Sequence, residues 1–233
     1  MLIGIDISPA CRKQKTGIEW YAWHVAKGVM RHLNGRADFV LYSDVKPDGS
    51  FDENDVRLLS WRSKYFWPEL RLSAELLRSK PDVLFVPSRA LPFVLPQKTV
   101  TTIHDVGFIA FPDERRRLSR EYLLMTSKRA ARRADQIITV SEFSKQEIMR
   151  YFHTPADRIH VTHLGYDAKR YVPRQGGAVT SDKPYILFVG RRERRKNIRM
   201  LVVAYEILAR TLEKDVPDLV LAGPPGHHAA EID

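Results

Sequence analysis

The sequence has 233 residues, of which 44% are hydrophobic and 28% charged, a composition typical of globular proteins. An excess of Lys and Arg over Asp and Glu gives a formal net charge of +10, which favours an anionic partner: nucleic acid, an acidic membrane surface or a phosphorylated substrate. The lone cysteine, Cys11, excludes an internal disulfide and is typical of a reducing compartment, and no apolar run approaches the length of a membrane-spanning helix.

Short apolar runs alternate with helical patterns along the chain. The first run, "LIGIDI", carries Asp6 and lacks the basic segment of a signal peptide, so we interpret it as a strand. Several runs are apolar at consecutive positions, as strands buried on both faces are. The further predicted strands are "FVLY", "DVLFV", "TVTTI", "QIITV", "RIHVTH", "YILFV" and "LVLAG".

Helices are expected between these runs. Their predicted bounds are Ile18–Leu33, Glu69–Lys80, Ser119–Ala134, Phe143–Phe152 and Ile198–Leu212. A repeated strand–helix–strand order predicts a parallel sheet with helices on both faces, so we expect a doubly wound α/β, Rossmann-like fold.

A domain boundary is predicted where Gly, Pro and polar residues interrupt the pattern, at residues 165–183. We therefore divide the chain into an N-terminal domain at residues 1–170, a linker at 165–183 and the beginning of a second domain at 184–233. A single βαβ unit cannot cover both faces of its own strands. We expect the second domain to be incomplete, and to need more chain or a partner.

The loop "GRRERRKN", Gly190 to Asn197, follows the strand run "YILFV". Ligands of parallel sheets bind at the carboxyl ends of strands, and Gly190 permits close backbone approach. Asn197 opens a helix whose first N–H groups attract anions, and Arg191 and Lys196 add charge. The pattern indicates a diphosphate site; a solvated basic loop is the alternative. The sequence has neither a G-x-G-x-x-G fingerprint nor a G-x-x-x-x-G-K-[ST] loop here.

Five segments together resemble the family 4 glycosyltransferases of the two-Rossmann (GT-B) type. They are "KTVTTIHDVGFIAFPD", "ADQIITVSEFSKQEI", "RIHVTHLGYD", "YILFVGRRERRKNI" and "LVLAGPPG". The resemblance implies a hexosyltransferase that moves a sugar from a nucleotide-diphosphate sugar to a glycan or lipid-linked acceptor. It also implies retention of anomeric configuration, with no metal and no other cofactor.

The resemblance also implies roles for individual residues. Arg191 and Lys196 match the basic pair on the donor diphosphate, where fixed cations stabilise the charge that grows on the departing phosphate. His104, in "TIHD", matches the catalytic histidine that contacts the donor sugar near the reacting carbon. Asp105 either joins this site or fixes its loop by hydrogen bonds. Gly17 matches the glycine of the first loop, which approaches donor phosphate or acceptor.

Two serines have a structural alternative. Ser141 lies in the "SEFSK" turn that borders the donor cleft in the resembling family. Ser144 and Glu147 fit an S-x-x-E capping box, and Ser141 would cap the same helix slightly earlier. Helix capping is the role that the residues themselves favour.

The sequence departs from the family after its last strand. No Glu-x₇-Glu pair, which holds the sugar and ribose of the donor in the family, follows "LVLAG". We therefore expect a fragment that is inactive alone. A non-catalytic module that binds a glycan or a partner is the alternative.

The first helix has an apolar face at helical spacing, comprising Ile18, Ala22, Val25, Val29 and Leu33. Trp20 lies opposite this face and Trp23 at its edge. The two tryptophans would stack on a sugar acceptor or sit at a lipid interface; packing beneath residues 65–67 is equally expected.

The helix from Ser119 is strongly basic. It carries Lys128, Arg129, Arg132 and Arg133 and is preceded by Arg115, Arg116 and Arg117. Like charges four residues apart repel mildly unless they meet an anion or remain solvated. We expect a cytoplasmic protein, peripheral on an anionic inner membrane face. Nucleic-acid binding ranks last, because no zinc, RNP or helix-turn-helix motif is present.

Overall fold

A computed structural model describes residues 1–52, 55–61, 66–112, 116–172, 183–212 and 214–224. The chain forms two compact units, the first of residues 1–107 and 121–165 and the second of residues 108–120 and 166–233. Most of the predicted linker, residues 173–182, lies outside the described ranges. The predicted domain bounds therefore stay a prediction.

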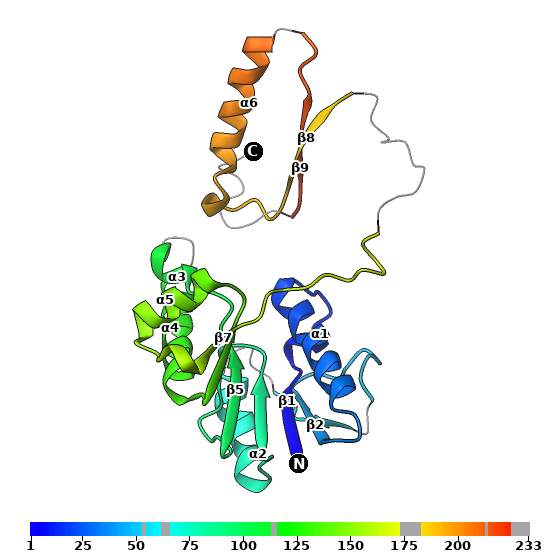
Figure 1. The fold of residues 1–233 in the computed structure, drawn as a ribbon, viewed down its shortest axis with the longest axis vertical. Coiled ribbons are helices and arrows are strands. Elements are labelled where there is room, and N and C mark those ends of the chain that lie inside the picture. The colour runs from blue at the N-terminus through cyan, green and yellow to red at the C-terminus, as the bar shows by residue number, and fades with distance from the viewer. Residues whose placement is uncertain (53–54, 62–65, 113–115, 173–182, 213, 225–233) are drawn as a thin grey trace. The chain divides into compact units, whose positions relative to one another are not determined.

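The first unit is built on a seven-stranded parallel sheet with helices beside it (Figure 1). Its strands are β1 (Leu2–Asp6), β2 (Asp38–Ser43), β3 (Val56–Leu58), β4 (Val83–Val86), β5 (Lys98–Thr102), β6 (Gln136–Thr139) and β7 (Ile159–Val161). This arrangement confirms the doubly wound, Rossmann-like fold. Strand β3 was not predicted, because its three residues are partly or fully exposed and form no apolar run.

The strand order β3-β2-β1-β4-β5-β6-β7 reverses direction between β1 and β4. From β1 the chain moves outward to β2 and β3, and then returns to place β4 on the other side of β1, with Ile3 beside Val83. In open α/β sheets, such a switch point opens a crevice at the carboxyl ends of the two central strands. The topology thus marks one position for a ligand before any side chain is considered.

The helices follow the predicted positions closely. They are α1 (Gly17–His32), α2 (Ser73–Arg78), α3 (Gly107–Ala110), α4 (Arg117–Arg133), α5 (Glu142–Phe152) and α6 (Ile198–Leu212). The predicted helix Glu69–Lys80 differs most. It begins at Trp67 as a π-helix, Trp67–Leu72, and only then continues as α2. Pro68 favours a helix start at this position. Proline lacks a backbone N–H, and residues in the first turn of a helix do not need one for the helix hydrogen bonds.

Helix α1 packs on the sheet through two small residues. Ala22 and Ala26 are fully buried against a cluster that includes Ile3, Ile5 and Leu41. Val25, Val29 and Leu33 pack around this cluster as predicted. The prediction that Ile18 packs with them is wrong: Ile18 lies in the first turn of the helix and is exposed.

The second unit contains the parallel strands β8 (Tyr185–Val189) and β9 (Asp218–Ala222) with α6 between them in sequence. Residues alternate in exposure along β8: Tyr185, Leu187 and Val189 are exposed, and the residues between them are half-buried. One face of this two-stranded sheet therefore carries apolar side chains in contact with solvent.

Candidate functional site

His104 lies two residues beyond β5, at the carboxyl edge of the first sheet. Its Nε2 is 3.4 Å from the carbonyl oxygen of Pro87. The ring meets Tyr21 of α1 edge-on, with 4.6 Å between ring centroids and an interplanar angle of 86°. Burial lowers the pKa of His104, and this effect exceeds the opposing effect of the Pro87 carbonyl. At neutral pH the imidazole is therefore uncharged.

Two further side chains fix the surroundings of His104. The hydroxyl of Tyr21 lies 3.0 Å from Thr102 Oγ1 on β5. Ser144 Oγ, on α5, donates to the carbonyl oxygen of His104 at 3.1 Å. Sequence reasoning did not identify Tyr21, because no local motif links a residue of the first helix to a loop after the fifth strand.

Ser141 caps α5. Its Oγ accepts a hydrogen bond from the Ser144 backbone N–H at 3.1 Å, and α5 begins at Glu142. The predicted capping box of Ser144 and Glu147 is wrong, since both residues lie inside the helix and Glu147 pairs with Arg150 at 3.6 Å. The S-x-x-E pattern placed the helix start about one turn too late, because "SEFS" contains two serines and the pattern selected the second.

Asp105 and Gly17 lie at loop ends of the same unit. Asp105 is exposed, and its Oδ1 accepts a hydrogen bond from the Gly107 backbone N–H at 3.1 Å, which fixes the entry to α3. Gly17 is the first residue of α1, and a Cβ there would meet no atom within 4 Å. The local fold does not require a glycine at this position. Sequence reasoning missed Glu19, whose carboxylate accepts from the Thr16 backbone N–H at 2.8 Å as a T-x-x-E pattern predicts.

Trp20 and Trp23 lie together on α1, with 6.1 Å between ring centroids. Trp20 is 41% exposed and has the Lys15 ammonium 5.6 Å from its ring centre. Trp23 packs partly against the core, which agrees with its predicted position at the edge of the apolar face. Of the expected cover at residues 65–67, Tyr65 lies outside the described residues and Phe66 contacts Tyr122.

The basic loop of the second unit begins where β8 ends. Arg191 lies 3.8 Å from Glu193, and Arg195 Nε donates to the same carboxylate at 2.8 Å. Lys196 ends a short 3₁₀ turn, is exposed, and has no ion pair within the described part of the chain. Asn197 follows in a left-handed conformation with φ 52°, and α6 begins directly after it, as predicted. Arg191 and Arg195 thus share one acidic neighbour, Glu193.

Gly190 is in close backbone contact with the loop that follows β9. Its N–H donates to the Ala222 carbonyl at 2.9 Å. Gly223 has φ +148°, and a Cβ built there would lie 1.9 Å from the Gly190 carbonyl oxygen. Only glycine fits at residue 223. The sequence gave no sign of this contact, because the close approach predicted at Gly190 was that of a phosphate and not of residue 223.

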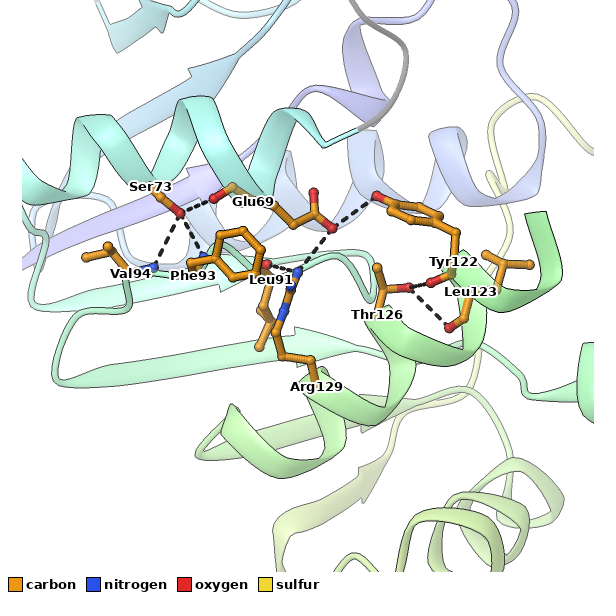
Figure 2. A network of polar contacts seen from close by, with 9 residues as sticks. All are labelled: Glu69, Ser73, Leu91, Phe93, Val94, Tyr122, Leu123, Thr126 and Arg129. Carbon is orange, nitrogen blue, oxygen red and sulfur yellow. Dashed lines mark hydrogen bonds and ion pairs between the residues drawn. The ribbon is translucent and has the colours of Figure 1, made fainter. Parts of the chain in front are cut away.

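The basic helix α4 has two different faces. Lys128, Arg132 and Arg133 are exposed, as expected for a charged surface. Arg129 instead points inward, where it pairs with the fully buried Glu69 at 3.0 Å and stacks on Phe93 (Figure 2). The prediction that Arg129 belongs to the anionic-surface patch is wrong. Arg115 lies outside the described residues.

The fold is that of a Rossmann-like α/β protein, and polar or basic residues follow the ends of its parallel strands. Comparison with known proteins narrows this class. The family model described as Glycosyltransferase Family 4 matches residues 16–170, more than half of the chain. The chain belongs to this family.

Individual relatives agree with the family match. O-antigen chain mannosyltransferase B of Escherichia coli is 33% identical over 165 residues, which are 67% of this chain and 42% of the relative. Alpha-maltose-1-phosphate synthase of Mycolicibacterium smegmatis is 31% identical over 106 residues, 41% of this chain and 26% of the relative. The chain thus spans less than half the length of these relatives.

A solved structure shares the fold. Sucrose-phosphate synthase from Thermosynechococcus elongatus matches with a TM-score of 0.65 at 14% identity, covering 100% of this chain and 72% of the other. At this identity the match concerns the fold alone. Across the described residues, none of the helices combines the length and apolar character that crossing a bilayer requires.

Proposed function

We propose that the protein transfers a hexose from a nucleotide-diphosphate sugar to a glycan or lipid-linked acceptor, with retention of configuration. The family match over residues 16–170 carries this proposal. One relative is named an O-antigen chain mannosyltransferase, which supports a sugar donor and a glycan acceptor.

The loop after β8 is our proposed diphosphate site. Bond breaking in the donor places negative charge on the departing phosphate, and cations held in place before the reaction stabilise that charge. Lys196 offers an ammonium that pairs with no acidic group in the described chain. Arg191 is 3.8 Å from Glu193, longer than the about 2.7–2.9 Å of a strong charge-assisted bond, so its guanidinium remains available to a phosphate.

His104 is our proposed contact to the reacting sugar. An uncharged imidazole can donate one hydrogen bond and accept another, which suits sugar hydroxyl groups. Its lowered pKa keeps it uncharged across the neutral range. In this proposal, no metal ion or organic cofactor takes part, and treatment with a chelator leaves turnover unchanged.

Steady-state sugar transfer by the full-length enzyme tests the diphosphate site. Arg191→Ala and Lys196→Ala should each lower kcat by about 10²–10³, the usual loss for one preorganised charge-stabilising contact. Arg194→Ala, in the same loop, is the matched control and should change kcat little. If the first two variants, folded by circular dichroism, transfer sugar like the parent, the site assignment is wrong. NMR of the product anomeric proton decides retention against inversion.

A lipid-linked acceptor would place the enzyme at a membrane surface. The exposed cations of α4, Lys128, Arg132 and Arg133, fit an anionic lipid surface. Binding to phosphatidylserine vesicles should weaken with added salt, and binding to phosphatidylcholine vesicles should be absent. Equal binding to both vesicle types, or sequence-dependent binding to DNA, contradicts this part of the proposal.

A further inference from the structure

Residues 87–91, in the loop between β4 and β5, are held in place by side chains from other elements. The Pro87 carbonyl oxygen lies 3.4 Å from His104 Nε2, just beyond β5. The Ser88 carbonyl oxygen accepts a hydrogen bond from Thr101 Oγ1 of β5 at 2.6 Å. A partly buried loop without secondary structure has few partners of its own for these carbonyl groups. Contacts from other elements therefore decide where its backbone lies.

The far end of the loop is held by a buried ion pair. Arg129 of α4 donates to the Leu91 carbonyl oxygen and to Glu69, and Figure 2 shows its guanidinium group between the two. Leu91 and Glu69 are both fully buried. Tyr122, also of α4, donates to the same Glu69 oxygen at 3.1 Å. Because a buried carboxylate needs its cationic partner, the ion pair fixes the position of Arg129 and with it that of the Leu91 carbonyl group.

The same network holds the residues after Leu91. Ser73 Oγ accepts from the Phe93 backbone N–H at 2.7 Å and donates to the Glu69 carbonyl oxygen (Figure 2). The Arg129 guanidinium group lies over the Phe93 ring, 4.6 Å from its centre. The loop after β4 is thus bound to α2 and to α4, while its first residues are bound to β5 and to His104.

The contact with Pro87 selects one form of the His104 ring. A carbonyl oxygen only accepts hydrogen bonds, so Nε2 carries the proton in this contact and Nδ1 is left as an acceptor. His104 is half-buried, and its Nδ1 makes no hydrogen bond within the described part of the chain. The geometry therefore leaves one acceptor nitrogen for a ligand.

The loop also acts on the charge of His104. Burial is the main cause of the lowered pKa of His104, and the next two influences both come from the loop. The Pro87 carbonyl raises the pKa, and the charge of Arg89 lowers it. The charges of Asp105 and Glu19 raise it as well. Since the two effects of the loop oppose each other, the position of the ring proton reports a displaced loop more clearly than the pKa does.

We propose that Arg129 and Thr101 are positioning residues for His104. By holding the carbonyl groups of residues 87–91, they keep the Pro87 oxygen at Nε2 and leave Nδ1 to accept a hydrogen bond from a hydroxyl group of the ligand. The consequence for catalysis rests on the proposed role of His104 in sugar transfer. The tautomer and its control by the loop do not, because both exist without any substrate.

Long-range ¹H–¹⁵N NMR spectra of the free chain measure the tautomer, because the protonated and unprotonated nitrogens of a neutral imidazole have well-separated ¹⁵N shifts. His104→Asn identifies the signals of His104 among those of the eight histidines. We expect the Nε2–H form to predominate in the parent protein. Predominance of the Nδ1–H form overturns the inference.

Two threonines of β5 offer a matched pair of variants. Thr101→Val keeps the shape of the side chain and removes the hydroxyl that holds Ser88. Thr99 lies on the same strand and is equally buried, but its hydroxyl has no hydrogen-bond partner within the described residues. We expect the share of the Nδ1–H form to rise severalfold in Thr101→Val and to stay at the parent value in Thr99→Val. The parent tautomer in folded Thr101→Val, or an equal change in both variants, overturns the role of Thr101.

A double variant tests the other end of the loop. Arg129→Met combined with Glu69→Gln removes the hydrogen bond to Leu91 without leaving a buried charge unpaired. We expect the Nδ1–H share to rise as in Thr101→Val. A folded double variant with the parent tautomer overturns the role of Arg129, because a purely structural ion pair would change stability and leave the ring of His104 as it is.

Sugar transfer by the full-length enzyme connects the tautomer with turnover. Thr101→Val should lower kcat and kcat/KM by the same factor, about 10–10², because a displaced group loses its contact in the transition state. Thr99→Val should transfer sugar like the parent. A changed tautomer with the parent turnover overturns the proposed role of His104 in transfer and leaves the positioning by the loop intact. The parent tautomer in the folded Thr101→Val and double variants overturns the positioning alone.

Discussion

Leu84 and Leu187 both occupy the interior of a parallel strand, yet Leu84 in β4 has no exposed surface and Leu187 in β8 is 51% exposed. Strand β4 has a neighbour on each side in a sheet of seven. Among the described residues, strand β8 pairs only with β9, and its exposed face carries Tyr185, Leu187 and Val189. Similar apolar runs therefore become a buried core in one unit and a solvent-facing surface in the other.

The difference shows what an apolar run determines. It predicts a strand, but the number of neighbouring elements decides whether that strand is buried, because a parallel sheet needs cover on both faces. The relatives named above are more than twice as long as the matched segments. We expect the exposed face of β8 and β9 to be covered in the working protein, either by further chain or by a partner.

Charge networks give the sharpest contrast between the units. Arg129→Met should destabilise the first unit by about 3–5 kcal/mol, because it leaves the fully buried Glu69 without its cationic partner. Arg195→Met removes the exposed partner of Glu193 and should cost at most about 1 kcal/mol. Urea unfolding followed by tryptophan fluorescence measures the loss of stability in Arg129→Met, since all four tryptophans lie in residues 20–67. Hydrogen exchange of α6 measures the loss of stability in Arg195→Met. Similar losses of stability in the two variants would contradict the expected difference between the units.

Two identical leucine truncations test burial directly. Leu84→Ala should lower the free energy of unfolding of the first unit by about 2–5 kcal/mol, through lost apolar burial and the cavity left behind. Leu187→Ala should change the free energy of opening in the second unit, measured by hydrogen exchange, by less than about 0.5 kcal/mol. A large loss at Leu187 would mean that its face is covered in solution.

Asp6 gives the stability of the first unit a pH dependence in the acid range. Its pKa is raised to about 6, so the folded state binds the proton more tightly than the unfolded state. The resulting stabilisation is complete below about pH 4, the unfolded pKa, and is lost as the pH rises through about 6. Asp6→Asn should remove this dependence, so its stability relative to the parent should rise by about 2–3 kcal/mol between those limits. A constant difference across the range would contradict the raised pKa.

The smallest expected effect concerns His104. Tyr21→Ala should expose the imidazole and raise its pKa toward about 6.5, while Tyr21→Phe, which keeps the ring, should change it less. NMR titration of the histidine ring protons measures both shifts and needs no substrate. A pKa that stays the same in Tyr21→Ala would show that burial by Tyr21 is not its cause.

Sequence patterns predicted most of the fold because its elements are locally encoded. The bounds of α6 are those predicted, and α1, α4 and α5 agree within two residues at each end. Strand β3 and the π-helix at Trp67–Leu72 were missed for physical reasons. Strand β3 depends on β2 for pairing, and the π-helix depends on Glu69 being held by a helix distant in sequence.

The candidate sites divide in the same way. Strand-end residues such as His104 and Arg191 could be placed from the pattern alone, because a strand ends where its apolar run ends. The crevice at the switch point could not be placed in this way, because no local segment of the sequence determines the order of the strands in the sheet. The inward direction of Arg129 was likewise hidden, because its partner Glu69 lies 60 residues away in sequence. The basic residues Lys128 and Arg132 of the same helix are exposed, so charge alone does not separate Arg129 from them.

The contact between Gly223 and Gly190 has a consequence for how the protein tolerates mutation. A side chain at residue 223 would collide with the backbone at Gly190, the residue from which the loop of Arg191 departs. A genetic screen would therefore score position 223 as essential although it has no side chain with which to touch a substrate. Its loss would be mistaken for a binding defect, when the altered feature is the direction in which a neighbouring loop leaves its strand.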